Sequence, residues 1–131
     1  MLGTRSPEIY GKRTYNDLVG MIVEYADKKD IECEFFQSNH EGAIVDRIQE
    51  SLGKTDGIVI NPAAFTHTSL AIGEAIDAVG IPAVEIHISD PDARDDFRKV
   101  NFIRPFCCGT VKGESLEGYI KAIKILEEKL T

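Results

Sequence analysis

Residues 57–89 read GIVINPAAFTHTSLAIGEAIDAVGIPAVEIHIS, with two apolar runs on either side of a helix-like pattern. The runs at 57–61 and 83–89 are rich in isoleucine and valine and have the length of buried strands. Between them, apolar residues recur at helical spacing from Leu70 to Val79, and Gly80 directly after them is a typical helix stop. Two strands joined by a helix predict a parallel pair with a crossover connection.

The same alternation continues on both sides of this unit. Capping patterns at Thr14, Ser38 and Ser115 predict helix starts, and Asp17 and Glu41 complete the first two capping boxes. We expect helices over residues 14–29, 38–52, 70–79, 92–99 and 115–130, and strands over residues 31–36, 57–61, 83–89 and 107–111. This order predicts an α/β fold in one domain of residues 1–131, with a parallel sheet covered by helices on both faces. Such folds normally open with a strand, and we expect that strand to be absent from this chain.

Length and charge narrow the class of protein. The chain has 131 residues and a net charge of −7, which suits one domain with its own core. A negative chain is a poor partner for nucleic acid, because a phosphate backbone requires a basic face. No apolar run approaches the roughly 18 residues of a membrane span, and no signal-peptide pattern begins the chain. We therefore expect a cytoplasmic protein without nucleic-acid or membrane partners.

Motifs of common cofactor sites are also missing from the sequence. Cys33, Cys107 and Cys108 form no C-x-x-C pair and have no metal-ligand spacing. His40 and Glu41 lack the second histidine of a zinc-binding H-E-x-x-H motif, and there is no glycine-rich phosphate loop. We therefore expect neither a metal nor a cofactor.

Polar residues lie at the carboxyl end of the strand predicted at 83–89. Period-two alternation places Glu85, His87 and Ser89 on one of its faces. Both faces of a strand in a parallel sheet are normally apolar, so this polar face needs an explanation. One explanation is an edge strand that faces solvent or another subunit. The other is a histidine that its neighbours orient for proton transfer.

A second polar group follows the strand predicted at 57–61. Asn61 and the proline after it end that strand. Thr66, Thr68 and Ser69 stand at the entrance of the next helix, where unpaired N–H groups favour an anion. These hydroxyls could instead only cap the helix, and His67 could be an ordinary surface residue. Because ligands of open α/β sheets bind at the carboxyl ends of the strands, we expect both polar groups to line one pocket.

Three arginines and a tyrosine could complete such a pocket. Arg94 and Arg98 lie one helical turn apart and could grip a carboxylate, although ion pairs with the neighbouring aspartates explain them more simply. Arg5 and Tyr10 share the loop at the start of the chain. A nearby guanidinium can lower a tyrosine pKa by about 1–3 units, which would make tyrosinate a plausible base.

Five motifs stand in a fixed order along the chain: LGTR at 2–5 with EIYG at 8–11, FFQSNHEG at 35–42, NPAAFTHTS at 61–69, VEIHIS at 84–89 and ARDDFR at 93–98. Together they resemble the type II 3-dehydroquinate dehydratases, or type II dehydroquinases, from Met1 to the C-terminal helix. The resemblance implies a flavodoxin-like fold. It also implies anti elimination of water from 3-dehydroquinate through an enolate, giving 3-dehydroshikimate without a metal or cofactor.

The resemblance assigns a role to each pocket residue. Tyr10 would be the base that takes the proton beside the ketone, and Arg5, together with Arg94, would help to hold it as tyrosinate. His87 would protonate the departing hydroxyl, with Glu85 orienting the ring. The substrate's hydroxyl and carboxylate groups would be bound by Asn61, His67, Ile88, Ser89, Arg94 and Arg98.

Family membership would further imply a homo-oligomer, a dodecamer built of trimers, in aromatic biosynthesis by the shikimate pathway or in quinate breakdown. Family members begin with an apolar strand and an asparagine ahead of the LGTR motif, so we expect a native form in which a strand precedes Met1. One alternative is a truncated, catalytically impaired member that binds ligand or assembles without turnover. Another is an unrelated flavodoxin-like binding or signalling module, whose phosphate loop or acidic cluster the sequence lacks.

Overall fold

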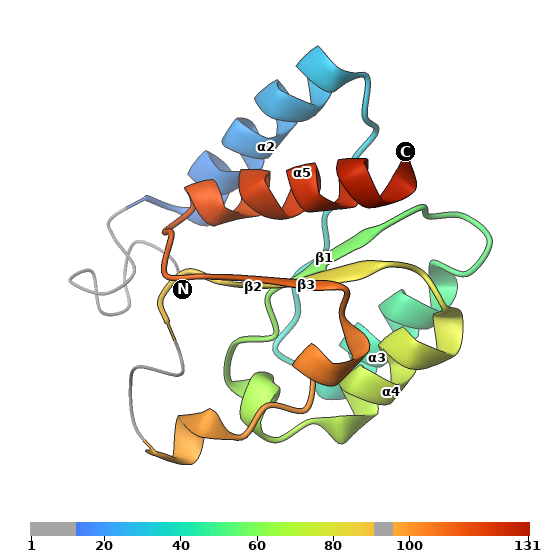
Figure 1. Ribbon diagram of the computed structural model, residues 1–131, viewed down its shortest axis with the longest axis vertical. Helices are drawn as coiled ribbons and strands as arrows, with labels where there is room; N and C mark the ends of the chain where they lie inside the picture. The colour runs from blue at the N-terminus through green and yellow to red at the C-terminus, as the bar shows by residue number, and fades with distance from the viewer. Residues whose placement is uncertain (1–12, 91–95) are drawn as a thin grey trace.

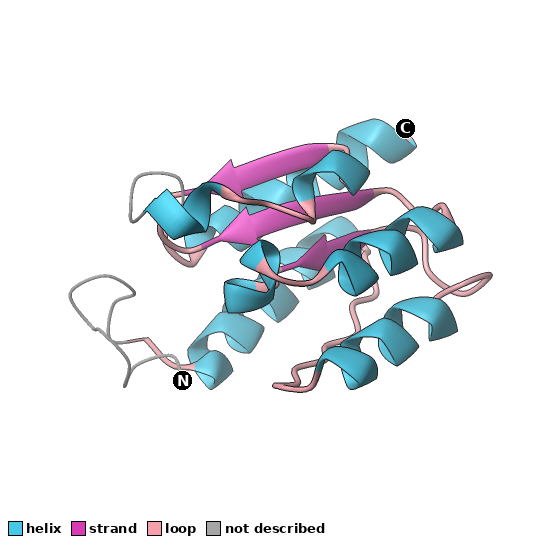
Figure 2. Cartoon of the chain, turned by 90° about the horizontal axis from the view of Figure 1, so that it is seen from below, coloured by secondary structure: helices cyan, strands magenta, loops and turns pink. Residues whose placement is uncertain are grey.

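The computed structural model describes residues 13–90 and 96–131, except for the side chains of residues 97 and 98. Its centre is a parallel sheet of three strands, which lie side by side in the order β1 (Ile58–Ile60), β2 (Ala83–His87) and β3 (Gly109–Lys112). The three strands point the same way (Figure 2). Their carboxyl ends therefore meet at one edge of the sheet, as the sequence pattern predicts.

Helices cover both faces of this sheet (Figure 1). One face is covered by α2 (Tyr15–Lys29) and α5 (Glu117–Leu130), and the other by α3 (Glu41–Glu50) and α4 (Leu70–Val79). Short 3₁₀ turns occupy the connections, namely η1 (Ala63–His67), η3 (Asp96–Lys99) and η4 (Arg104–Phe106). The predicted α/β architecture is confirmed. None of the helices in the described part is long and apolar enough to cross a membrane.

Alternation along β2 divides the core into two layers. Val84 and Ile86 pack under α5, in a cluster with Val111, Ala122 and Leu126. Ala83 points to the opposite layer, where it packs in a cluster with residues of α3 and α4. Glu85 and His87 share the parity of Ala83, so they point to the α4 side of the sheet. An edge strand facing solvent is therefore the wrong explanation for them: β2 lies between β1 and β3, and Glu85 is 0% exposed.

Local capping agrees with the sequence at α2 and α4 but not elsewhere. Thr14 and Asp17 form the predicted capping box, and Gly80 ends α4 with a left-handed φ of 67°. The capping box predicted at Ser38 is wrong, because its hydroxyl accepts from the N–H of His40 over 3.0 Å and α3 begins at Glu41 without a side-chain cap.

The helix start predicted at Ser115 is also wrong. Ser115 has a φ of 56°, and its N–H donates to the carbonyl of Ile88, which holds it in the turn that precedes α5. The N-cap of α5 is Leu116, one residue further on, and it makes no side-chain cap.

Two predicted strands differ from the structure. Residues 31–36 have no regular secondary structure, and no described segment pairs with them, although Ile31 and Cys33 still pack against the α2 and α5 cluster. A strand needs a hydrogen-bonded neighbour, which explains the difference. The last strand begins at Gly109 rather than 107, because the N–H of Cys107 closes η4 by donating to Arg104.

A prediction that falls partly outside the described residues is the helix at 92–99. Within the described part only the 3₁₀ turn at Asp96–Lys99 is present.

Candidate active site

His87 and Glu85 form a buried pair at the carboxyl end of β2. Nε2 of His87 lies 2.5 Å from Oε2 of Glu85, and the two residues are 6% and 0% exposed. Alternate residues of a strand lie on the same face, which is why these side chains can meet. A carboxylate oxygen only accepts, so Nε2 carries a proton and donates it to this bond. The pair therefore fixes the orientation of the imidazole and leaves Nδ1 as its second nitrogen.

The Glu85 carboxylate has three further donors. Oε2 also accepts from the side-chain amide of Asn101 over 2.6 Å. Oε1 accepts from Nε of Arg104 over 2.9 Å and from the Thr110 hydroxyl over 3.0 Å. Burial alone would raise the pKa of Glu85, but the hydrogen bonds from His87, Asn101 and Arg104 outweigh it and lower the pKa to about 2. Glu85 is therefore a carboxylate at neutral pH, although solvent does not reach it.

Asn101 is held on both sides of its amide. Its Oδ1 accepts from the N–H groups of Ile103 and Arg104, at 2.9 and 2.8 Å, while its Nδ2 donates to Glu85. These partners fix which end of the amide is oxygen. The sequence reasoning missed Asn101, Arg104 and Thr110. The available signal was an asparagine shortly before an Arg-Pro pair, a pattern typical of a side-chain-stabilised turn.

We call residues 61–69 the substrate wall, because the resemblance places substrate contacts there. Asn61 follows β1 directly, and its Oδ1 accepts from the N–H of Ala63 over 3.0 Å while its Nδ2 donates to the Tyr119 hydroxyl over 2.9 Å. Ala63 has a φ of 49°, a left-handed conformation that costs an alanine roughly 1–2 kcal/mol. The Asn61 hydrogen bond supports this strained turn.

The substrate wall also contacts the segment that carries Asn101. Nδ1 of His67 lies 2.8 Å from the carbonyl oxygen of Val100, and the N–H of Phe102 donates to the carbonyl of Thr66. Since a carbonyl only accepts, His67 is protonated on Nδ1. His67 is thus not an ordinary surface histidine. Ser69 does cap α4, because its hydroxyl accepts from the N–H of Ile72 over 3.0 Å.

Strand register brings these two polar groups to one edge of the sheet. Ile60 of β1 pairs with Glu85 of β2, so the residue after β1 and the end of β2 are neighbours. Ile88 and Ser89 extend this edge, and their carbonyls accept from the N–H groups of Ser115 and Gly113.

The side chains of four predicted site residues lie outside the described part of the structure. Arg5, Tyr10 and Arg94 lie outside the described residues. Arg98 belongs to η3, where only its backbone is described.

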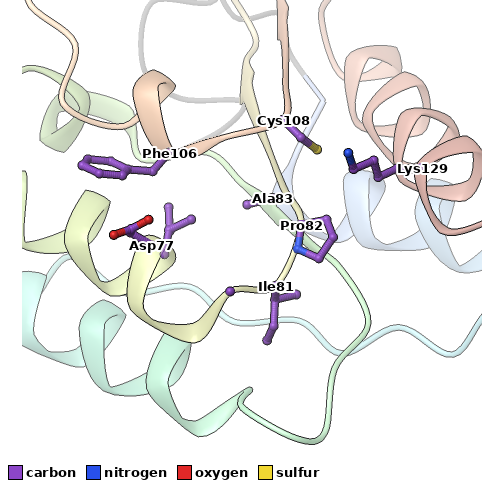
Figure 3. Close-up of a pocket in the computed structure, with 9 residues that line it drawn as sticks. Asp77, Ile81, Pro82, Ala83, Phe106, Cys108 and Lys129 are labelled. Atoms are coloured by element: carbon purple, nitrogen blue, oxygen red, sulfur yellow. The ribbon is translucent and has the colours of Figure 1, made fainter.

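A small hollow lies at the opposite edge of the sheet and is separate from this site. Its volume is about 190 Å³, and its walls include Asp77, Phe106, Cys108 and Lys129 (Figure 3). It also contacts Ala83, the first residue of β2, whereas His87 is the last residue of that strand. The hollow therefore does not lie where the sequence predicts the substrate.

Comparison with known proteins identifies the family. Residues 1–127 match the model of the family described as Dehydroquinase class II. The chain is 51% identical over 119 residues to a 3-dehydroquinate dehydratase of Campylobacter hominis, a match that spans 91% of this chain and 77% of that protein. It is 47% identical over 131 residues to a 3-dehydroquinate dehydratase of Caldicellulosiruptor saccharolyticus, spanning 99% and 90%.

The crystal structure of a type II dehydroquinase from Butyrivibrio crossotus superposes with a TM-score of 0.94 at 50% identity, over 96% of this chain and 88% of that one. Family model, sequence identity and fold agree over nearly the whole length of the chain. The chain belongs to the class II dehydroquinase family.

Proposed function

We propose that this protein removes water from 3-dehydroquinate and gives 3-dehydroshikimate, as a type II dehydroquinase of the shikimate pathway. The observation that carries the proposal is the buried His87–Glu85 pair at the carboxyl end of the middle strand, with Nε2 and Oε2 2.5 Å apart. Family membership and the names of the two relatives, both 3-dehydroquinate dehydratases, support the same reaction.

Tyr10 starts the reaction in this proposal. As tyrosinate, held by Arg5, it takes the proton beside the ketone of the substrate and leaves an enolate. An enzyme needs a general acid as well, because the departing hydroxide is a poor leaving group, and acid and base can each contribute about 10²–10⁴-fold. The base and acid together account for an elimination that requires no metal or cofactor.

His87 supplies the acid. Its Nε2–H is committed to Glu85, so the proton passes from Nδ1 to the hydroxyl of the enolate intermediate, and water leaves as the double bond forms. Before this step the ring is a positive imidazolium, which the ionised Glu85 beside it stabilises. Return of a proton from Tyr10 to His87 through solvent resets both groups.

Substrate binding belongs to the remaining residues of the edge. We assign the hydroxyl and carboxylate groups of the substrate to Asn61, His67, Ile88, Ser89, Arg94 and Arg98. The fixed amide of Asn61 and the Nδ1-protonated ring of His67 support this assignment, because each presents a defined donor or acceptor. We further propose one domain of residues 1–131, assembly as a dodecamer of trimers, and a cytoplasmic location.

Enone absorbance tests the reaction directly. The purified protein is mixed with 3-dehydroquinate, and the rise in ultraviolet absorbance of the conjugated product is followed. We expect turnover by the natural chain and a loss of about 10²–10⁴-fold in His87→Asn. His40→Asn is the matched control, because His40 is exposed and its side chain does not cap α3. No absorbance rise with the natural chain would contradict the proposed reaction.

A growth test addresses the pathway. A bacterial strain without its own dehydroquinate dehydratase needs added aromatic amino acids. Expression of this chain should remove that need, and expression of His87→Asn should not. Failure of an enzyme that is active in vitro to restore growth would contradict the biosynthetic role, and growth on quinate would then test the catabolic one.

A further inference from the structure

Arg104 contacts the catalytic pair from outside the residues assigned above. It begins η4, on the segment that connects η3 to β3, and its Nε donates to Oε1 of Glu85 over 2.9 Å. Its side chain is 35% exposed, whereas the carboxylate it binds is fully buried. Arg104 therefore reaches inward from the surface to the buried end of the pair.

Every acceptor position of Glu85 has a donor. A carboxylate offers about four lone-pair positions. Two of them are taken on Oε2 by His87 and Asn101, and two on Oε1 by Arg104 and Thr110. Without Arg104, Oε1 would keep only the neutral hydroxyl of Thr110. The carboxylate could then rotate or take a proton, and either change would weaken its hold on Nε2 of His87.

We propose that Arg104 is a positioning residue for the acid step, which holds Glu85 ionised and turned so that Oε2 stays directed at His87. This inference rests on the proposed function, because it concerns the acid of that reaction. Arg104 acts through Glu85 and is not assigned a contact with substrate.

The charged groups around Glu85 indicate that Arg104 stabilises this carboxylate throughout the proposed catalytic cycle. Among described residues, the titratable or charged groups close to this carboxylate are His87, Arg104 and Cys107. Burial, with a contribution from Glu85, raises the pKa of the Cys107 thiol to about 12, so it stays neutral. His87 gives up its charge in the proposed cycle, whereas arginine stays protonated throughout. Arg104 therefore balances Glu85 in the part of the cycle in which the imidazole is neutral.

The test replaces Arg104 while leaving the groups that contact substrate in place. Arg104→Met removes the charge and the donor but keeps much of the length, and Arg104→Lys keeps the charge. We expect kcat of Arg104→Met to fall about 10- to 100-fold, the scale of a hydrogen bond to a charged group, with KM within about twofold. Arg104→Lys, which keeps the charge, should recover part of the lost kcat.

Two variants separate this role from a general structural one. Arg47→Met on α3 also loses an ion pair, with Glu34, and should keep the natural kcat. Thr110→Val removes the other donor to Oε1 without removing a charge, and should lower kcat less than Arg104→Met does. A natural kcat in Arg104→Met, or a change in KM alone, would overturn the proposal.

Nitrogen NMR of the imidazoles gives a readout that does not need turnover. We expect the ¹⁵Nε2 and Nε2–H signals of His87, assigned with His87→Asn, to shift in Arg104→Met, because a carboxylate held by fewer donors binds the Nε2–H less firmly. Unchanged Nε2 signals in a folded Arg104→Met protein would refute the positioning role. If the natural chain did not turn over 3-dehydroquinate, the proposed function would fail while this measurement still decided the role of Arg104. Should Arg104→Met fail to fold, Arg104→Lys is measured in the same way, with the same criterion.

Discussion

Asn61 and Tyr119 join the end of β1 to helix α5 through a hydrogen bond of 2.9 Å between the side-chain amide and the phenol. Tyr119 packs with the buried residues of α2 and α5, and burial raises the pKa of its hydroxyl, so the hydroxyl stays protonated. Asn61 meanwhile accepts from Ala63 over 3.0 Å. The orientation of a proposed substrate contact thus depends on a residue that is 58 positions away in the sequence.

Tyr119→Phe should loosen Asn61 without touching the acid and base. A neutral hydrogen bond contributes about 1 kcal/mol, so we expect KM to rise about fivefold while kcat changes little. Steady-state kinetics of the absorbance assay measure both constants. Tyr25→Phe is the control. It loses a hydrogen bond from α2 to Glu127 on α5, the helix that also carries Tyr119, but it leaves Asn61 in place. An unchanged KM in Tyr119→Phe would show that Asn61 does not need this support.

Tyr10→Phe should abolish turnover and leave substrate binding intact. The substitution removes the ionisable oxygen that the proposed mechanism uses as base and keeps the aromatic ring. Calorimetric titration with 3-dehydroquinate measures binding, and the absorbance assay measures turnover. Tyr15→Phe, an exposed residue at the start of α2, should behave like the natural chain. Substantial turnover by Tyr10→Phe would refute the assignment of the base.

Glu85 should make stability depend on pH in the acidic range. Its pKa is about 2 in the folded protein against an ordinary 4.5, so the folded state binds its proton less readily than the unfolded state does. The stabilisation is then complete above about pH 4.5 and is lost as the pH falls toward about 2. The full effect is about 3 kcal/mol at 1.36 kcal/mol per pKa unit. Urea unfolding at pH values from 2 to 7 measures it.

Glu85→Gln isolates the contribution of this carboxyl from those of exposed carboxylates. The difference in free energy of unfolding between the natural protein and Glu85→Gln should be largest near neutral pH. We expect about 3–5 kcal/mol, because the substitution leaves Arg104 without its buried ionised partner. The difference should shrink as the pH falls, since the natural carboxylate also becomes protonated. A difference that is constant with pH would contradict the low pKa of Glu85.

Gly73→Ala should displace the segment that carries Asn101 and Arg104. A Cβ atom at Gly73 would lie 2.3 Å from the carbonyl oxygen of Phe102 and 2.7 Å from the ring of Phe106. We expect a loss of about 1–3 kcal/mol of stability, as for other overpacked sites, and a lower kcat. Gly20→Ala in α2 is the control, because nothing lies within 4 Å of its Cβ position and alanine favours a helix by about 1 kcal/mol. Thermal unfolding and kinetics compare the two.

The sequence predicts what depends on local pattern. Alternation in β2 places Glu85 and His87 on one face, and Thr14, Ser69 and Gly80 act at helix ends as their residue types predict. Residues 31–36 have the composition of a strand but none of the described segments pairs with them, so pattern alone misleads there.

The rest of the candidate site depends on contacts between distant segments. Asn101 and Arg104 belong to no helix or strand with a readable period, and their importance comes from the Glu85 carboxylate, 16 and 19 residues away. The sequence adjacent to these two residues does not indicate that they bind a buried carboxylate. A reader of the sequence can find the histidine and its carboxylate, but not the side chains that hold the carboxylate.

The consecutive residues Val100 and Asn101 tie the two halves of the site together: the first accepts from His67 of the substrate wall, and the second donates to Glu85. A displacement of His67 would therefore be transmitted to the Glu85 carboxylate through the peptide unit that joins Val100 and Asn101. If substrate binds against His67, as the proposed function has it, a well-fitting molecule would also fix the orientation of His87. Selectivity would then appear in kcat as well as in KM.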